Sequence, residues 1–241
     1  MKFFDLLLSL IYVPKCVSCH TRLPFDSTAP LCPVCRAEYE NEKMRTCAVC
    51  ASRLSDCTCV PPEVQCGTGK MIKIFRYRPA HPELATQRMI YTLKHRRNTP
   101  LCQLLSRDLS AAVLREVGNR REQYIITYPP RSRTAIRENG FDHTEMLAKA
   151  LGQQTAIPVL PTLRRMGGAV QKKLSRTERM KNALAAFAPQ KDLSLKGKRV
   201  LLLDDVVTTG ATLAAAARHL RRMGAREVIT VSVAVTLREG I

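Results

Sequence analysis

Eight cysteines in four close pairs constrain the fold of the first quarter of this 241-residue chain most strongly. The pairs read CVSC, CPVC, CAVC and CTC, and they contain Cys16, Cys19, Cys32, Cys35, Cys47, Cys50, Cys57 and Cys59. A C-x2-C turn bends the backbone so that two thiolates can meet one tetrahedral ion. We predict two structural zinc ions with four thiolates each, which leaves no open coordination position for a catalytic water.

Several alternatives to this arrangement remain open at this point. Sequential pairing would place Cys16 to Cys35 on one ion and Cys47 to Cys59 on the other, whereas an interleaved cross-brace would mix them. Cys66 can replace one member of the CTC pair, and Cys102 is most simply a free thiol. Iron–sulfur ligation uses similar ligands. A disulfide framework is the competing interpretation, but it needs an oxidising compartment and suits widely spaced cysteines better.

The N-terminal sequence MKFFDLLLSLIYVP resembles a signal peptide only loosely. Asp5 interrupts its apolar run, and no small-x-small cleavage site follows before Pro14. The apolar residues between positions 3 and 11 instead fit one face of a short amphipathic helix. The sequence contains no apolar run of 18 or more residues, so we expect no transmembrane segment and a cytoplasmic protein.

From about residue 70, apolar strand-like segments alternate with helical patterns. Strands are predicted at 71–77, 123–130, 157–165, 198–206 and 228–237, and helices at 83–97, 100–117, 144–154 and 211–223. Asp142 is a candidate cap for the third of these helices. Such alternation is typical of a parallel α/β sheet. We therefore expect a Cys-rich domain with the N-terminal helix over residues 1–68, and an α/β domain over residues 69–241.

The basic charge is concentrated in the second region. The chain has a formal net charge of +19, and residues 71–241 hold 31 basic and 13 acidic residues. This balance favours polyanions such as nucleic acids, phosphorylated metabolites or an anionic membrane surface. A protein that is simply basic and soluble is the plain alternative.

The stretch LLLDDVVTTGATL (201–213) carries the most specific chemistry. Asp204 and Asp205 stand near the end of a buried strand, where ligands bind in parallel sheets. A glycine-containing turn at a helix N-terminus can hold a phosphate, and threonine hydroxyls add donors. Two carboxylates would repel that phosphate, but they suit two adjacent sugar hydroxyls or a magnesium ion. The stretch therefore predicts a site for a ribose 5-phosphate unit.

Other phosphate-binding motifs are absent from the sequence. It contains neither G-x-x-x-x-G-K-[ST] nor G-x-G-x-x-G. A capping aspartate with threonines that merely fill a turn is the alternative, but it does not explain the paired aspartates.

Residues 201–213 resemble the phosphoribosyl-pyrophosphate (PRPP) motif of type I phosphoribosyltransferases. The resemblance implies that Asp204 and Asp205 bind the ribose 2- and 3-hydroxyls. It also implies that the loop binds the 5-phosphate through Thr208, Thr209, Gly210, Ala211 and Thr212. Mg²⁺ would accompany PRPP.

The whole chain is similar to the ComF family, in which a zinc ribbon precedes a phosphoribosyltransferase-like domain. Further matches are YTLKHRRN (91–98), the PP-arginine segment with GFDH (129–143) and QKKLSRTERMKNALAAF (171–187). The family commonly reads R-G-F-N-Q where this chain reads Asn139-Gly140-Phe141-Asp142-His143. This departure removes a basic residue and replaces two amides.

Basic side chains near the predicted site can neutralise the pyrophosphate leaving group. The resemblance places the pyrophosphate loop at Pro130, Arg131, Ser132 and Arg133, with Arg131 acting beside Asp204 and Asp205 in catalysis. Lys94 is a further candidate phosphate ligand. The basic segment 167–182 stands where such enzymes carry a mobile loop. His143 is a candidate acid or base, although a single histidine is more often structural.

Three functions fit these observations. The first is transfer of phosphoribosyl from Mg-PRPP to an unidentified acceptor. The second is a ComF-type accessory role in DNA uptake (competence), with binding to single-stranded DNA and a partner helicase. The third is a PRPP- or nucleotide-responsive regulator without catalysis. The few aromatic residues give only modest support for base stacking along a single strand.

Overall fold

The computed structural model describes residues 13–166 and 184–237. The predicted N-terminal helix over residues 3–11 and most of the predicted mobile basic segment 167–182 lie outside these residues. Among the described helices, none is both long and apolar enough to cross a bilayer.

The centre of the protein is a four-stranded parallel sheet in the order β1-β6-β5-β2. Its strands are β1 (Met71–Tyr77), β2 (Tyr124–Thr127), β5 (Arg199–Val207) and β6 (Glu227–Thr236). The two inner strands are almost entirely buried, which is why they read as continuous apolar runs. The predicted parallel α/β fold is confirmed.

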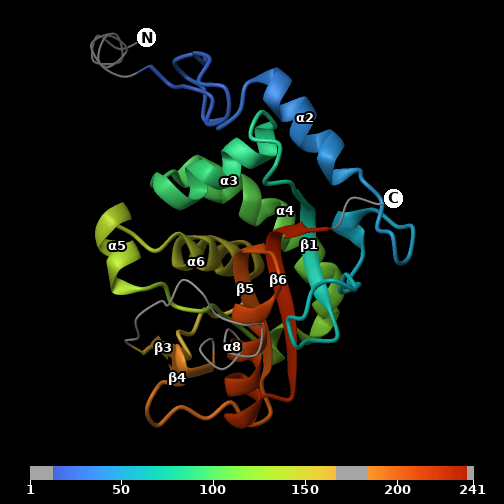
Figure 1. Cartoon of the computed structure of the whole chain (residues 1–241), viewed down its shortest axis with the longest axis vertical. Helices are drawn as coiled ribbons and strands as arrows, with labels where there is room; N and C mark the ends of the chain where they lie inside the picture. The colour runs from blue at the N-terminus through green and yellow to red at the C-terminus, as the bar shows by residue number, and fades with distance from the viewer. Residues whose placement is uncertain (1–12, 167–183, 238–241) are drawn as a thin grey trace.

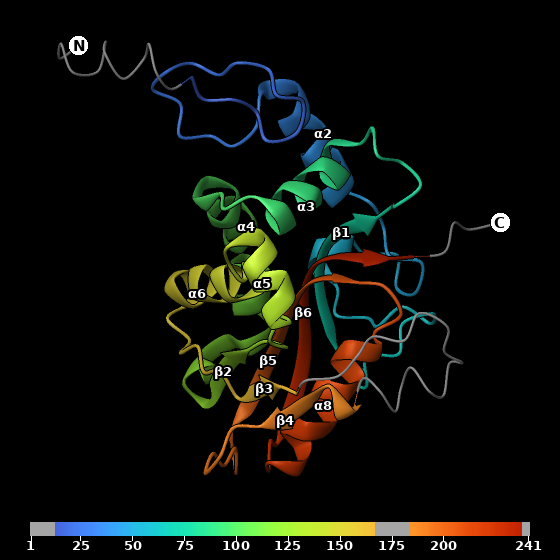
Figure 2. The ribbon, with the colours of Figure 1, turned by 60° about the vertical axis from the view of Figure 1, so that its left-hand side comes forward.

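Helices cover both faces of the sheet (Figures 1 and 2). The main helices are α3 (Ala85–His95), α4 (Thr99–Val117), α6 (His143–Thr155) and α8 (Ala211–Arg222). Alternate residues of β5 divide between two cores: Leu201 and Leu203 pack in the core that contains α4 and α6, and Val200 and Leu202 pack with α8. The sheet is therefore the middle layer of three.

The third predicted strand differs from the prediction. Only Leu163–Arg165 form a strand, β3, and it pairs antiparallel with β4 (Phe187–Pro189) outside the main sheet. Val159 makes one isolated parallel bridge to Ile126. Pro158 and Pro161 have no N–H to donate, so this segment cannot sustain a ladder along β2.

Short elements complete the described chain. They are α2 (Pro33–Lys43), α5 (Arg133–Asn139) and the 3₁₀ turns η1 (Leu54–Asp56) and η2 (Gly118–Gln123). The predicted helix cap at Asp142 is confirmed, since its Oδ1 accepts hydrogen bonds from the backbone N–H groups of Thr144 and Glu145. In Figure 1 the segment with α2 lies at one end of the molecule, beside α3.

Candidate functional site

The paired aspartates lie at the carboxyl end of β5. Asp205 is buried, and its Oδ2 lies 3.0 Å from Nε2 of His143 and 3.3 Å from Nζ of Lys94. Lys94 belongs to the last turn of α3, and His143 is the first residue of α6. Helices from one side of the sheet thus supply both neighbours of this carboxylate.

Arg131 extends this arrangement into a chain of three polar groups. Its Nη1 lies 2.8 Å from Nδ1 of His143. A guanidinium can only donate, so Nδ1 accepts this hydrogen bond and the ring hydrogen of a neutral imidazole sits on Nε2, facing Asp205. The chain Arg131–His143–Asp205 therefore fixes the orientation of the imidazole and of the carboxylate.

Asp142 joins the segment before α5 to the start of α6 through hydrogen bonds. Its Oδ2 accepts a hydrogen bond of 3.2 Å from the backbone N–H of Arg131, while its Oδ1 caps α6. The first residues after β2 are thus held against the helix that carries His143.

The two carboxylates have opposite electrostatic environments. Burial, followed by the charge of Asp205, raises the pKa of Asp204 well above its ordinary value of 3.8. Burial also acts to raise the pKa of Asp205, but His143 and Lys94 outweigh it and hold that pKa below 3.8. The pair therefore carries one carboxylate stabilised as an anion by His143 and Lys94, and one that forms no ion pair among the described residues.

The turn after β5 depends on Gly210. Its φ of +80° lies in the left-handed region, and a Cβ at this position would come within 2.7 Å of the backbone nitrogen of Cys66. The carbonyl of Thr209 accepts a 2.9 Å hydrogen bond from the N–H of Gln65. This close approach fixes the turn that leads into α8.

A cavity of about 290 Å³ opens over the paired aspartates. Seven predicted site residues line it together: Lys94, Pro130, Arg131, Ser132, Asp204, Asp205 and Thr212. Five further residues line it: His143, which the sequence offered as a candidate acid or base, and Pro129, Ala135, Thr144 and Arg165. The segment after β2, the end of α3 and the end of β5 thus converge on one cavity.

Other predicted site residues lie beside this cavity. Arg133 lines a neighbouring cavity of about 860 Å³ that shares Pro130 and Arg131 with the first. Thr208 and Thr209 are exposed in the turn, whereas Gly210 is buried at the start of α8. Ala211, half-buried, is the first residue of α8.

His143 was considered as an acid or base, but its contact with Asp205 was not predicted. The departure from the family's usual sequence at positions 139–143 is a signal in this region, but it argued against a role carried over from the family and did not predict the contact. Arg165 gave no such signal, because its place at the cavity depends on the antiparallel pairing of β3 with β4.

The cysteines gather in two groups, as sequential pairing predicts. The groups are Cys16, Cys19, Cys32 and Cys35, and Cys47, Cys50, Cys57 and Cys59, and within each group the sulfur atoms lie within 4.8 Å of one another. Each group could hold a metal ion, and a set of four sulfur ligands suits zinc. The interleaved alternative is wrong, and Cys66 and Cys102 belong to neither group.

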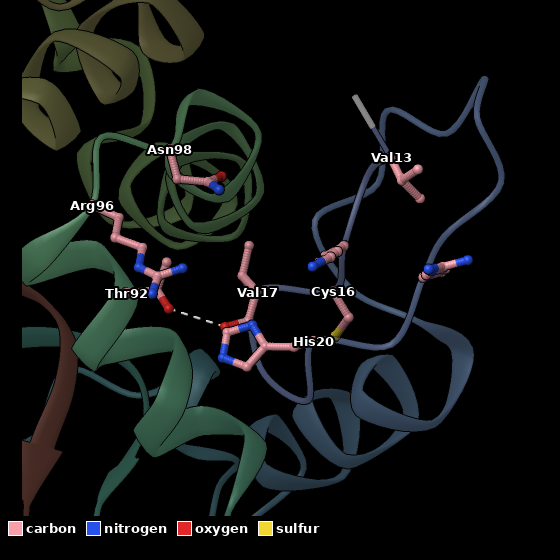
Figure 3. Close-up of a pocket in the computed structure, with 9 residues that line it drawn as sticks. Val13, Cys16, Val17, His20, Thr92, Arg96 and Asn98 are labelled. Atoms are coloured by element: carbon pink, nitrogen blue, oxygen red, sulfur yellow. Dashed lines mark hydrogen bonds between the residues drawn. The ribbon is translucent and has the colours of Figure 1, made fainter. Parts of the chain in front are cut away.

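A second cavity, of about 500 Å³, lies between the first cysteine group and the corner that joins α3 to α4 (Figure 3). Four of its lining residues can carry positive charge: Lys15, His20, Arg22 and Arg96. None of the described residues that line it is acidic. The Thr92 hydroxyl donates a 3.0 Å hydrogen bond to the backbone carbonyl of Val17 and joins the two walls.

Comparisons with known proteins agree with this architecture. The phosphoribosyl transferase domain family matches residues 148–239. Competence protein ComFC of Bacillus subtilis is 25% identical over 87% of this chain and 78% of its own length. DNA utilization protein YhgH of Escherichia coli K12 is 28% identical over 88% of this chain and 86% of its own length.

Among solved structures, a hypoxanthine phosphoribosyltransferase from Staphylococcus aureus aligns over 54% of this chain and 61% of its own, with a TM-score of 0.36 and 15% identity. The parallel sheet and the family match on residues 148–239 define a type I phosphoribosyltransferase-like domain. Two four-cysteine groups precede it, and relatives named ComFC and YhgH cover most of the chain. Together these features fit a zinc-ribbon and phosphoribosyltransferase-like protein of the ComF family.

Proposed function

We propose that the cavity at the end of β5 binds PRPP or a related ribose 5-phosphate ligand. Asp204 and Asp205 would accept hydrogen bonds from the two ring hydroxyls, because ionised carboxylates only accept. Lys94 and His143 keep Asp205 oriented and anionic for this task. The observation that carries the proposal is this pair of carboxylates in a cavity that Arg131 and Lys94 also line.

The phosphates of the ligand would lie on either side of the sugar. The turn from Thr208 to Thr212 would hold the 5-phosphate at the N-terminus of α8, where backbone N–H groups and the helix dipole favour an anion. Lys94 and the segment from Pro130 to Arg133 would face the pyrophosphate, since they are basic or polar residues that line the same cavity or its neighbour.

The residues present also fit a magnesium ion brought in with PRPP. Asp204 supplies hard carboxylate oxygens that line the cavity. Mg²⁺ bound there would neutralise charge on the pyrophosphate as it leaves.

The reaction that this arrangement supports is pentosyl transfer. The bond between C1 of the ribose and the pyrophosphate oxygen would break, with its electron pair leaving on pyrophosphate. An acceptor atom would then bond to C1 and release its proton. Arg131 would stabilise the departing charge. The relatives named for competence and DNA utilization favour a role for this chemistry in DNA uptake or use.

Calorimetric titration with Mg-PRPP tests the proposal. We expect saturable binding to the wild-type protein and a loss of about tenfold or more in affinity for Asp205→Asn, which removes a charged acceptor. Asp26→Asn changes an exposed carboxylate outside the cavity and should bind like the wild type. Absence of binding to the wild type, or equal binding to Asp205→Asn, would overturn the proposal.

The basic cavity of Figure 3 favours a second candidate function, binding to single-stranded DNA. Lys15, Arg22 and Arg96 present positive charge without an acidic lining residue, which suits backbone phosphates. Fluorescence anisotropy with a labelled oligonucleotide at several salt concentrations tests it. Arg22→Glu should weaken binding and reduce the salt dependence, whereas Arg218→Glu, on the exposed surface of α8, should have a smaller effect. Equal effects of the two changes would reject a role for this cavity.

A further inference from the structure

Lys73 is a buried lysine in the middle of β1, and its side chain contacts the second cysteine group. It is 0% exposed. Its Nζ lies 3.1 Å from Sγ of Cys57 and 2.8 Å from the backbone carbonyl oxygen of Cys59. Within the described residues, Lys73 has no carboxylate at ion-pair distance, so the cysteine group faces its charge instead.

Burial of an ammonium without a negative partner is strongly unfavourable. A four-thiolate site with one divalent ion carries a formal charge of about −2, since each thiolate contributes one negative charge. Such a site is the anionic partner that the buried Lys73 needs. The same ammonium would lower the repulsion among the four metal-bound thiolates.

Strand β1 also holds the backbone of the same ligand segment. The N–H of Met71 donates a 2.9 Å hydrogen bond to the carbonyl of Thr58, between the two cysteines of the CTC sequence. Lys73 follows two positions later on the same strand and contacts both flanking cysteines. Two positions of a sheet strand therefore position two of the four sulfur ligands.

A further contact, from helix α4, completes this attachment. The guanidinium of Arg115, on α4, donates to the backbone carbonyl of Ser55 at 2.7 Å and to Oδ1 of Asp56 at 2.8 Å. These residues lie between Cys50 and Cys57, so α4 and β1 together hold the loop that carries the ligands.

The first cysteine group has a different environment. Cys19 is 3.2 Å from the Thr21 hydroxyl and 3.6 Å from the sulfur of Cys32, and no lysine or arginine is hydrogen-bonded to a sulfur of this group in the described part of the chain. The two groups therefore differ in the charge placed beside them.

We propose that Lys73 is a positioning residue for the metal ion of the second cysteine group, and that it couples this ion to the central sheet. The ammonium compensates the thiolates and orients Cys57 and Cys59, while the metal-bound thiolates allow Lys73 to remain buried in β1. Occupancy of the second group thereby stabilises the phosphoribosyltransferase-like domain itself.

Zinc competition in the full-length protein tests this coupling. Two backgrounds isolate the groups: Cys19→Ser leaves the second group intact, and Cys50→Ser leaves the first. A chromogenic chelator then reports the affinity of the remaining site. In the Cys19→Ser background we expect Lys73→Met to weaken zinc binding by about 10- to 100-fold, as loss of a residue that orients ligands commonly does. In the Cys50→Ser background it should have no effect.

Lys70→Met is the matched control. Lys70 lies just before β1, is 45% exposed in its side chain and pairs with Glu116 rather than with a cysteine. This change should leave zinc affinity unchanged in both backgrounds. Equal weakening by Lys73→Met and Lys70→Met, or no weakening by either, would overturn the proposal.

Amine acylation followed by mass spectrometry keeps the proposal testable if Lys73→Met does not fold. In the protein with its natural lysines and zinc bound, Lys73 should resist acylation while Lys70 reacts. Removal of zinc by a chelator should expose Lys73 to the reagent. Continued protection of Lys73 after complete zinc removal would show that its burial does not depend on the metal, and would contradict the coupling.

Discussion

Nε2 of His143 lies 3.0 Å from Oδ2 of Asp205, at the point where the first residue of α6 meets the end of β5. Arg131 occupies the other ring nitrogen, so the imidazole is held from both sides. Asp205 is thereby compensated by His143 and Lys94, while the adjacent Asp204 forms no ion pair among the described residues and has a raised pKa. This asymmetry leads to distinct predictions for the two carboxylates.

Replacement of His143 tests its role in orienting Asp205. His143→Ala removes a donor from a buried carboxylate and should lower the free energy of unfolding by about 1–3 kcal/mol. His143→Gln supplies an amide donor and should lower the free energy of unfolding by less than His143→Ala does. Chemical denaturation of the three proteins measures the difference. An alanine variant as stable as the wild type would contradict a stabilising contact between His143 and Asp205.

Neutralisation of the two aspartates should affect stability differently. Asp205→Asn leaves Lys94 and His143 without their anionic partner, and should cost about 1–3 kcal/mol of unfolding free energy. Asp204→Asn removes a carboxylate whose ionised form is unfavourable in the fold, and should leave the ligand-free protein at least as stable at neutral pH. Thermal unfolding of both variants without ligand checks this. Equal destabilisation by both changes would be inconsistent with the pKa shifts.

The pH dependence of stability should reveal the same asymmetry. The pKa of Asp204 is raised above 3.8, so the folded state binds its proton more tightly, and this group lowers stability as pH rises from about 3.8 through the folded pKa. The pKa of Asp205 is lowered, so its contribution is present above 3.8 and is lost as pH falls below that value. Unfolding curves across pH should therefore show that the stability of Asp204→Asn relative to the wild type increases as pH rises. A constant difference across pH would exclude this assignment.

Gly210 should tolerate no side chain. Both Gly210 and Gly197 have positive φ values, +80° and +77°, but only at Gly210 would a Cβ meet the backbone of residues 65 and 66. Gly197→Ala should lower the free energy of unfolding by about 1–2 kcal/mol, because alanine is strained in the left-handed backbone conformation. Gly210→Ala should lower the free energy of unfolding by about 1–3 kcal/mol more than Gly197→Ala, because the added Cβ forces the packed backbone to shift. Equal unfolding free energies for the two variants would contradict the close packing of this turn.

Metal content should follow the two cysteine groups. Elemental analysis should find about two zinc ions per chain, since each group offers four sulfur ligands. Cys16→Ser should lose one ion, because Cys16 belongs to the first group. Cys66→Ser and Cys102→Ser should retain both ions, although the two residues are buried like most of the ligands. Loss of zinc in Cys102→Ser would disprove the assignment of ligands.

The central elements of the fold could be predicted from the sequence because their signals are local. The apolar runs of β5 and β6, the alternation with helices and the cap at Asp142 each depend on neighbouring residues. Helix α5 was not predicted, since its seven residues are largely exposed and carry no apolar stripe. The pairing of β3 with β4 was also missed, because it joins segments that are distant in sequence.

Only part of the candidate site has a local signal. The paired aspartates and the Thr-Thr-Gly turn are contiguous, so their chemistry can be read directly from the sequence. The contacts of His143 and Lys94 with Asp205 depend on how α6 and α3 pack against the sheet. The contact between Lys73 and Cys57 likewise required the fold, since a lysine within an apolar strand gives no indication of its partner.

The central claim, that the paired aspartates hold a ribose diol, is tested most directly by removal of one hydroxyl from the ligand. Calorimetry should compare ribose 5-phosphate with 2-deoxyribose 5-phosphate under identical magnesium and salt conditions. We predict that the 2-deoxy sugar binds about 10- to 100-fold more weakly, because it lacks a hydrogen bond to a charged acceptor. Equal affinities for the two sugars would contradict the assignment of Asp204 and Asp205 to the diol.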